Sequence, residues 1–195
     1  MSIDGWLEAF GLASGLLCVW LLIRQNIWTF PIGLAYAAVT VFVMARNQLY
    51  ADVLLNAYYV AINAYGWWYW SRGGVQGDDE LPVTWTPNST RLTLIIISVA
   101  GIAAMTWTLS NTDADLVFWD STTTVLSFVA MWMTARKYVE NWIVWFVVDV
   151  IAAIMYVYKG ITLYAVLYAV YLIMAVWGWR AWRASQIAGT QASTA

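Results

Sequence analysis

Polar side chains recur at helical spacing inside several long apolar stretches of this 195-residue chain. In residues 141–158, Trp142, Trp145 and Asp149 follow one another at steps of three and four, which places them on one helical face. The same stretch holds no Lys or Arg to pair with the carboxylate. An acid in an apolar helix is costly enough to indicate function. We therefore expect Asp149 to bind a solute beside an aromatic wall.

Three other stretches carry comparable polar faces. In residues 50–70, the polar side chains and a glycine fall at steps of four and three: Asp52, Asn56, Tyr59, Asn63 and Gly66. Residues 161–181 repeat the spacing with Tyr164, Tyr168, Tyr171, Ala175 and Gly178, and residues 117–135 offer Asp120. A seam of helix packing is the alternative interpretation. The candidate solute-binding residues are Asn56, Tyr59, Asn63, Asp120, Trp142, Trp145, Asp149 and Tyr168.

These residue types suit a flat heteroaromatic solute, plausibly a cation. Aromatic faces stack on planar rings and attract cations. Asn and Tyr can hydrogen-bond a sugar hydroxyl or an amide, whereas the apolar stretches lack the Arg or Lys that a phosphate would need. The chain has no His and a single cysteine, Cys18, so we expect no metal, no cofactor and no catalytic triad. Its net charge of −2 gives no indication of nucleic-acid binding.

Composition identifies the elements that must carry these residues. The chain is 63% hydrophobic and only 10% charged, too little polar surface for a water-soluble globule. A helix needs about 20 apolar residues to cross a bilayer. The sequence predicts an all-α polytopic membrane protein with seven spans near residues 6–23, 28–45, 50–70, 92–109, 117–135, 141–158 and 161–181.

The remaining segments predict one membrane domain with few extramembrane parts. Residues 71–91 contain two prolines and an acidic run, which are typical of a loop, and residues 184–195 are small and polar, typical of a flexible tail. Seven of the nine Lys and Arg residues fall on the side of the C-terminus. By the positive-inside rule, the C-terminus and the 71–91 loop are cytoplasmic and the N-terminus is outside.

An internal repeat links the two halves. Trp28 and Leu49-Tyr50-Ala51 match Trp142 and Leu163-Tyr164-Ala165 at an offset of 114, and Gly66-Trp67 matches Gly178-Trp179 at 112. Chance is the alternative in a chain so rich in Trp and Tyr. A true repeat would make residues 5–70 and 116–183 two parallel three-helix units, joined by a linker helix at 92–110. Transporters bind their substrates between such repeats.

Several motifs resemble the PnuC family of nicotinamide riboside transporters. The most specific is the run from Arg136 to Trp145, and the others are Phe118-Trp119-Asp120-Ser121, Ile27-Trp28-Thr29-Phe30-Pro31, Leu49-Tyr50-Ala51-Asp52 and Tyr65-Gly66-Trp67-Trp68. The similarity covers about residues 10–183.

The resemblance implies further properties. They are a three-plus-one-plus-three helix arrangement like that of the SWEET sugar transporters, a homotrimer in the bacterial inner membrane, and facilitated diffusion of a vitamin for NAD biosynthesis, with trapping by a cytoplasmic kinase. It also implies a pocket of Trp and Asn-type residues, for which the matching candidates are Trp142, Trp145, Asp149, Asn56, Tyr59 and Asp120.

Other functions remain open at this stage. Relatives in the same family take thiamine or riboflavin, and a cationic solute fits thiamine as well as nicotinamide riboside. A membrane enzyme acting on lipids or quinones lacks the usual His or nucleophile cluster in this chain. A sensor or assembly protein would have little surface outside the bilayer for partners. We therefore expect a transporter that is not an enzyme.

Overall fold

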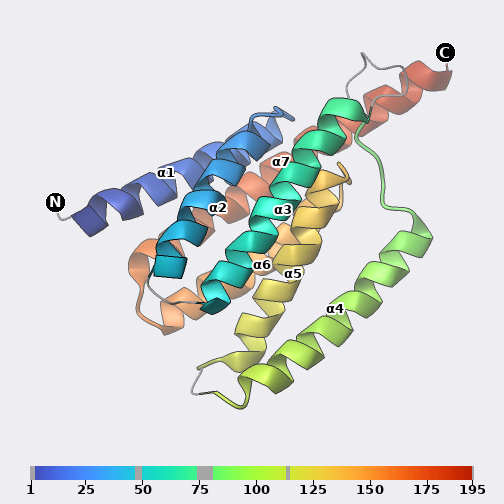
Figure 1. The fold of residues 1–195 in the computed structure, drawn as a ribbon. Helices are drawn as coiled ribbons and strands as arrows, with labels where there is room; N and C mark the ends of the chain where they lie inside the picture. Colours follow the sequence, from blue (N-terminus) through green and yellow to red (C-terminus); the bar gives the residue numbers. More distant parts are fainter. Residues whose placement is uncertain (1–2, 47–49, 74–80, 113–114, 195) are drawn as a thin grey trace. The chain divides into compact units, whose positions relative to one another are not determined.

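The computed structural model describes residues 3–46, 50–73, 81–112 and 115–194. Within these ranges every regular element is a helix, with no strand and one isolated bridge between Thr84 and Tyr138. Seven helices follow in order: α1 (Ile3–Ile23), α2 (Thr29–Arg46), α3 (Tyr50–Arg72), α4 (Asn88–Leu109), α5 (Val117–Ala135), α6 (Asn141–Tyr158) and α7 (Thr162–Thr194) (Figure 1). The predicted all-α fold with seven helices is confirmed.

The helices fall into two compact units. The first unit, Met1–Pro82, contains α1 to α3, and α2 packs against both of its neighbours. The second unit, Val83–Ala195, contains α4 to α7, where α6 packs against α5 and α7, and α4 packs against α5. Gly101 of α4 lies against Val125 of α5. Because glycine has no side chain, the two helices approach closely at this point. Each unit thus has its own central helix, α2 or α6.

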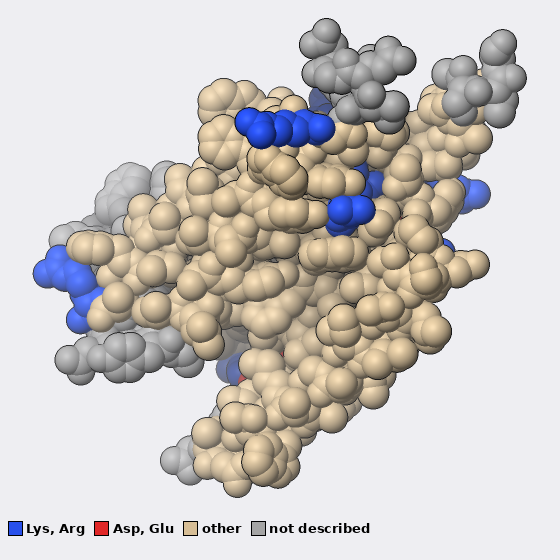
Figure 2. Space-filling model, turned by 45° about the vertical axis from the view of Figure 1, so that its right-hand side comes forward, with Lys and Arg blue, Asp and Glu red and all other residues tan. Residues whose placement is uncertain are grey.

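Three of the helices are long and apolar enough to cross a bilayer by length and composition. They are α4, α6 and residues Thr162–Gln191 of α7, with mean hydropathies of 2.0, 1.7 and 1.6. Large apolar side chains such as Ile95, Trp107 and Ile154 are exposed on them. The face shown in Figure 2 is almost entirely uncharged, with a few isolated Lys and Arg side chains. Such a surface is stable against lipid rather than water.

The two tight turns that enter the central helices have the same local geometry. Gln25 before α2 and Lys137 before α6 both take the left-handed conformation, with φ of 54° and 60°. A left-handed residue at the end of a helix lets the chain reverse direction at once. Gln25 and Lys137 stand 112 residues apart, and so do the first residues of α2 and α6.

A glycine and two aromatic rings pack alike in both units. Phe30 of α2 lies on Gly66 and meets Trp70 edge-on, with ring centroids 4.9 Å apart. Trp142 of α6 lies on Gly178 and meets Trp182 in the same way at 5.6 Å. The residue of the first unit that is equivalent to Trp142 is therefore Phe30, 112 positions earlier. The sequence-based match of Trp142 to Trp28, at an offset of 114, is wrong, because Trp28 is exposed.

Two segments differ from the sequence-based prediction. Residues 84–86, inside the predicted loop 71–91, lie against the turn between α5 and α6, where the Thr84 amide donates to the Lys137 carbonyl at 3.2 Å. Linker helix α4 accordingly begins at Asn88, inside the predicted loop 71–91. Helix α7 continues through the predicted tail 184–195 as far as Thr194. Ala and Gln favour helix there, and Gln186 donates to the Thr190 hydroxyl one turn later.

Candidate functional site

Asp149 lies buried on α6 among apolar neighbours. Its side chain is 6% exposed, and Val148 and Ala152 beside it are equally buried. None of the described residues donates a hydrogen bond to the carboxylate or forms an ion pair with it. A buried carboxylate without a partner destabilises the fold, which makes Asp149 a candidate for binding a solute.

Trp145, one turn before Asp149, is held by a buried polar network. Its indole Nε1 donates to the Thr134 hydroxyl on α5 at 3.3 Å. That hydroxyl donates in turn to Asn141 Oδ1 at 3.2 Å or to the Ala130 carbonyl at 2.9 Å. Asn141 Nδ2 donates to the Tyr138 carbonyl at 2.6 Å, which fixes the orientation of the amide. The network ends at a ring that is itself only half-buried.

Trp142, predicted as part of the aromatic wall, is fully packed within the second unit. It is 2% exposed, with its ring enclosed by Gly178 and Trp182 of α7. Its Nε1 has no hydrogen-bond partner among the described residues. Trp142 thus contributes close packing between α6 and α7.

The other two candidates of the second unit lie toward the far end of α6. Tyr168 of α7 stacks on Tyr156 with centroids 5.4 Å apart, and Tyr164 stacks on the same Tyr156 at 5.2 Å. Asp120 of α5 lies 4.0 Å from Lys159, with both side chains partly exposed. Asp120 is therefore a partly solvated acid, unlike Asp149.

The first unit carries the three remaining candidates on α3. Asn63 is buried, and its Nδ2 donates to the Tyr59 carbonyl at 2.8 Å. The Asn63 amide lies against Gly33 of α2, where an added Cβ would come within 2.6 Å of Oδ1. Tyr59 meets the neighbouring Tyr58 edge-on at 5.8 Å, and Asn56 is half-buried one turn earlier.

The structure therefore brings Trp142, Trp145 and Asp149 onto one face of α6, as the spacing predicted. Sequence reasoning missed Thr134 and Asn141, which form the hydrogen-bond network at Trp145. A signal existed, because Asn141 falls inside the Arg136–Trp145 run that carries the family resemblance. Thr134 offered none, since a helical threonine usually bonds only its own backbone.

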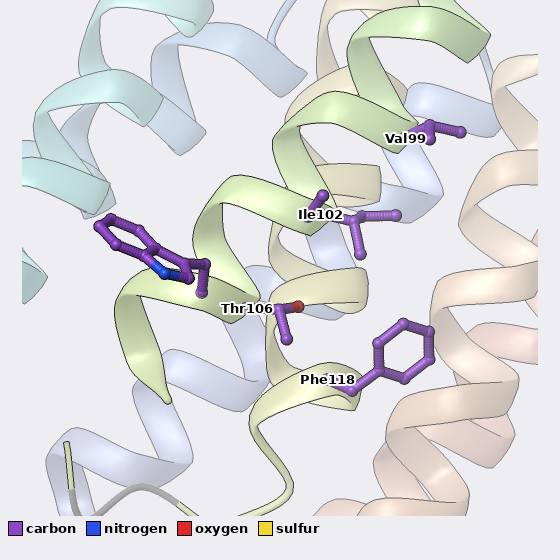
Figure 3. Close-up of a pocket in the computed structure, with 6 residues that line it drawn as sticks. Val99, Ile102, Thr106 and Phe118 are labelled. Atoms are coloured by element: carbon purple, nitrogen blue, oxygen red, sulfur yellow. The ribbon is translucent and has the colours of Figure 1, made fainter. Parts of the chain in front are cut away.

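An apolar hollow of about 580 Å³ lies between α4 and α5. Figure 3 shows Val99, Ile102 and Thr106 along α4, with Phe118 at the start of α5. None of the eight candidate residues lines this hollow, and it offers little polar chemistry. Among the described residues, no three His, Cys, Asp or Glu side chains are grouped to hold a metal ion.

Comparisons with known proteins agree with this architecture. The chain is 32% identical over 202 residues to the nicotinamide riboside transporter PnuC of Escherichia coli (strain K12), covering 91% of this chain and 84% of that protein. It is 25% identical to the riboflavin/roseoflavin transporter RibM of Streptomyces davaonensis, covering 91% and 84%.

The crystal structure of the vitamin B3 transporter PnuC has the same fold, with a TM-score of 0.72 and 23% identity over 94% of this chain and 83% of that one. The family model described as "Nicotinamide mononucleotide transporter" matches residues 5–184. The chain is therefore a multi-pass membrane protein that belongs to the nicotinamide mononucleotide transporter family.

Proposed function

We propose that this protein imports nicotinamide riboside across the bacterial inner membrane. The observation that carries the proposal is the 32% identity, over 91% of the chain, to a relative named as a nicotinamide riboside transporter. Asp149 on α6 supports it, because this carboxylate has no partner among the described residues and the nicotinamide ring of the solute is a planar cation.

The proposed pocket assigns a role to each part of the solute. Asp149 faces the pyridinium charge, and the Trp145 ring stacks on the heterocycle. Trp142 supports this face from behind through its contacts with α7. Tyr168 adds an aromatic surface in the second unit. In the first unit, Asn56, Tyr59 and Asn63 are the side chains that we propose to hydrogen-bond a ribose hydroxyl or a carboxamide. Asp120 attracts the cation toward the entrance, because it is the more exposed acid.

The riboside suits these residues better than the nucleotide that gives the family its name. A phosphate needs Arg or Lys, and neither occurs in α6 or in residues 162–179 of α7. We therefore propose that the protein binds the riboside, whose ribose carries no phosphate, rather than the mononucleotide.

Transport is proposed to be facilitated diffusion, with the two three-helix repeats exposing the solute alternately to each side. A cytoplasmic kinase would then trap the riboside by phosphorylation. The chain has no His, and Asp149 has no Lys or Arg beside it on α6, so it lacks an evident proton relay. An uncoupled carrier is the simplest mechanism for these residues.

Topology and assembly complete the proposal. If all seven helices span the membrane, seven of the nine Lys and Arg residues fall on the same side of the membrane as the C-terminus. By the positive-inside rule, this distribution favours a cytoplasmic C-terminus and an external N-terminus. The homotrimer is proposed from the resemblance to the PnuC family.

Riboflavin is the second candidate, because a relative named as a riboflavin/roseoflavin transporter covers the same share of the chain. Its isoalloxazine ring is planar but neutral, and it would leave Asp149 without a counter-charge. Thiamine, a cation without ribose, is the remaining candidate from the sequence.

The test is calorimetric titration of the purified protein with four solutes: nicotinamide riboside, nicotinamide mononucleotide, thiamine and riboflavin. We expect micromolar binding of nicotinamide riboside alone. Tighter binding of riboflavin or thiamine would move the chain to that substrate, and equal binding of riboside and mononucleotide would refute the argument from missing basic residues. Counterflow in proteoliposomes with and without a pH gradient tests coupling, since accumulation driven by the gradient alone would contradict facilitated diffusion.

A further inference from the structure

We infer that Thr134 and Asn141 are positioning residues that set the orientation of Trp145 toward the solute. This inference rests on the proposed function, because it assigns a purpose to a ring that the proposal places against the heterocycle. The carrying observation is the hydrogen bond from Trp145 Nε1 to Thr134 Oγ1, which joins α6 to α5 across the turn at residues 136–140.

The network is directional at each step. Asn141 Nδ2 is committed to the Tyr138 carbonyl, so Oδ1 is the atom that faces Thr134. The Thr134 hydroxyl has one proton, which it gives to Asn141 Oδ1 or to the Ala130 carbonyl. Its lone pairs therefore accept from the Trp145 N–H. Because Thr134 is 2% exposed and Asn141 is fully buried, water competes poorly for these bonds.

The first unit shows that the turn forms without this network. The turn at residues 24–29 makes the same backbone hydrogen bonds, including Gln25 N to the Leu22 carbonyl at 2.9 Å, as Lys137 N does to the Thr134 carbonyl. Leu22 stands where the second unit has Thr134, and Gly33 stands where it has Trp145. The first unit links its two helices across this turn by Thr29, at the position of Asn141, whose hydroxyl donates to the Cys18 carbonyl at 2.9 Å. The turn thus forms there with neither a hydroxyl at the position of Thr134 nor an indole at the position of Trp145. The network serves the position of the Trp145 ring instead.

An orientation role matters for stacking. A tryptophan ring gains from a planar cation only when its face is turned toward it. A half-buried indole without a hydrogen bond would sample several rotamers, and binding would have to select one of them. The buried bond to Thr134 fixes the ring before the solute arrives.

The test compares nicotinamide riboside affinity by calorimetry for the wild type and for Thr134→Val, which removes the hydroxyl and keeps the shape. We expect the dissociation constant to rise about fivefold, the loss typical of one neutral hydrogen bond. Thr134→Ala should reproduce the loss, and Thr134→Ser should restore the wild-type affinity. The matched control is Thr122→Val on the same helix, because the buried Thr122 hydroxyl donates to the Phe118 carbonyl and to no indole. It should leave the affinity unchanged.

A double-mutant cycle separates positioning from general structure. In a Trp145→Phe background, which lacks the indole N–H, Thr134→Val should change the affinity less than about 1.5-fold. An unchanged affinity in Thr134→Val, or an equal loss in both backgrounds, would overturn the inference while leaving the substrate intact. A wild-type chain that binds no nicotinamide riboside would refute the proposed function and this inference together.

Discussion

The two three-helix repeats, α1 to α3 in the first unit and α5 to α7 in the second, share their packing residues and differ in their polar ones. In both, a left-handed turn residue precedes the central helix, an arginine lies over a tryptophan, and an aromatic ring packs on a glycine. Where α6 has Asp149, however, α2 has Ala37, and both positions are buried. The duplicated residues build the fold, and the residues that break the duplication are the strongest candidates for function.

The same comparison separates the predicted aromatic wall into two parts. Trp142 occupies the position of Phe30, which packs in the same way on its own glycine. Trp145 occupies the position of Gly33, where the first unit instead accommodates the Asn63 amide. Trp142 therefore belongs with the packing residues, whereas Trp145, Asp149 and Asn63 stand at positions that only one unit uses for polar or aromatic chemistry.

The largest expected effect comes from filling the shared glycine position. In Gly178→Ala, the added Cβ would lie 2.4 Å from Trp142 ring atoms that are enclosed on all sides. Gly66→Ala would meet the Phe30 ring at a similarly short distance. We expect each to destabilise its unit by about 3 kcal/mol, measured as a lower thermal unfolding midpoint in detergent.

The control is Gly189→Ala on α7, where no atom lies within 4 Å of the added carbon. It should leave the midpoint unchanged or raise it. Tolerance of alanine at Gly178 but not at Gly66 would show that the two units do not share this packing.

The next largest effect is expected from exchanging the residues at the position where α2 has Ala37 and α6 has Asp149. Ala37→Asp places an unpartnered acid in the first unit and should cost about 2.5 kcal/mol. The reciprocal Asp149→Ala should raise the unfolding midpoint, because it removes an acid that is buried without a partner. A drop in the midpoint for Asp149→Ala would mean that Asp149 stabilises the fold, and its proposed binding role would lose its basis.

A smaller effect tests a contact that only the second unit has. Glu140 Oε2 accepts from both the amide and the hydroxyl of Thr86 at 2.9 Å, and Oε1 accepts from Arg91 at 2.6 Å. Glu140→Gln exchanges one acceptor oxygen for a donor and should cost about 1–2 kcal/mol. Arg91→Met should cost less, under about 1 kcal/mol, because the arginine is half exposed. An unchanged unfolding midpoint in Glu140→Gln would mean that residues 84–86 pack on the α5–α6 turn without the Glu140 hydrogen bonds.

The smallest effect compares the two acids of the second unit. Asp120 is partly exposed and 4.0 Å from Lys159, so its charge is screened by water and salt. Asp120→Asn should weaken nicotinamide riboside binding less than about twofold, measured by calorimetry at low salt. A loss as large as that caused by Asp149→Asn would place the cation at Asp120.

Hydropathy and charge predicted the seven helices, because Lys, Arg and Asp stand at or near most helix ends. They could not predict the docking of residues 84–86, which depends on backbone pairing between Thr84 and the distant α5–α6 turn. Spacing placed Trp142, Trp145 and Asp149 on one face correctly. It could not tell a packed ring from an accessible one, since periodicity carries no information on what lies opposite. Aligning the two repeats at a uniform offset of 112 would have matched Trp142 and Gly178 to Phe30 and Gly66, and so would have indicated that Trp142 is a packed ring.

The most direct test of the central claim is whether Asp149 recognises the positive charge of the solute. Calorimetry would compare nicotinamide riboside with its reduced dihydro form, which has the same atoms in the ribose and carboxamide but no pyridinium charge. We predict that the wild type binds the cation at least about tenfold more tightly, and that Asp149→Asn binds both forms equally. A wild type without preference, or a preference that survives in Asp149→Asn, would show that Asp149 does not recognise the pyridinium charge.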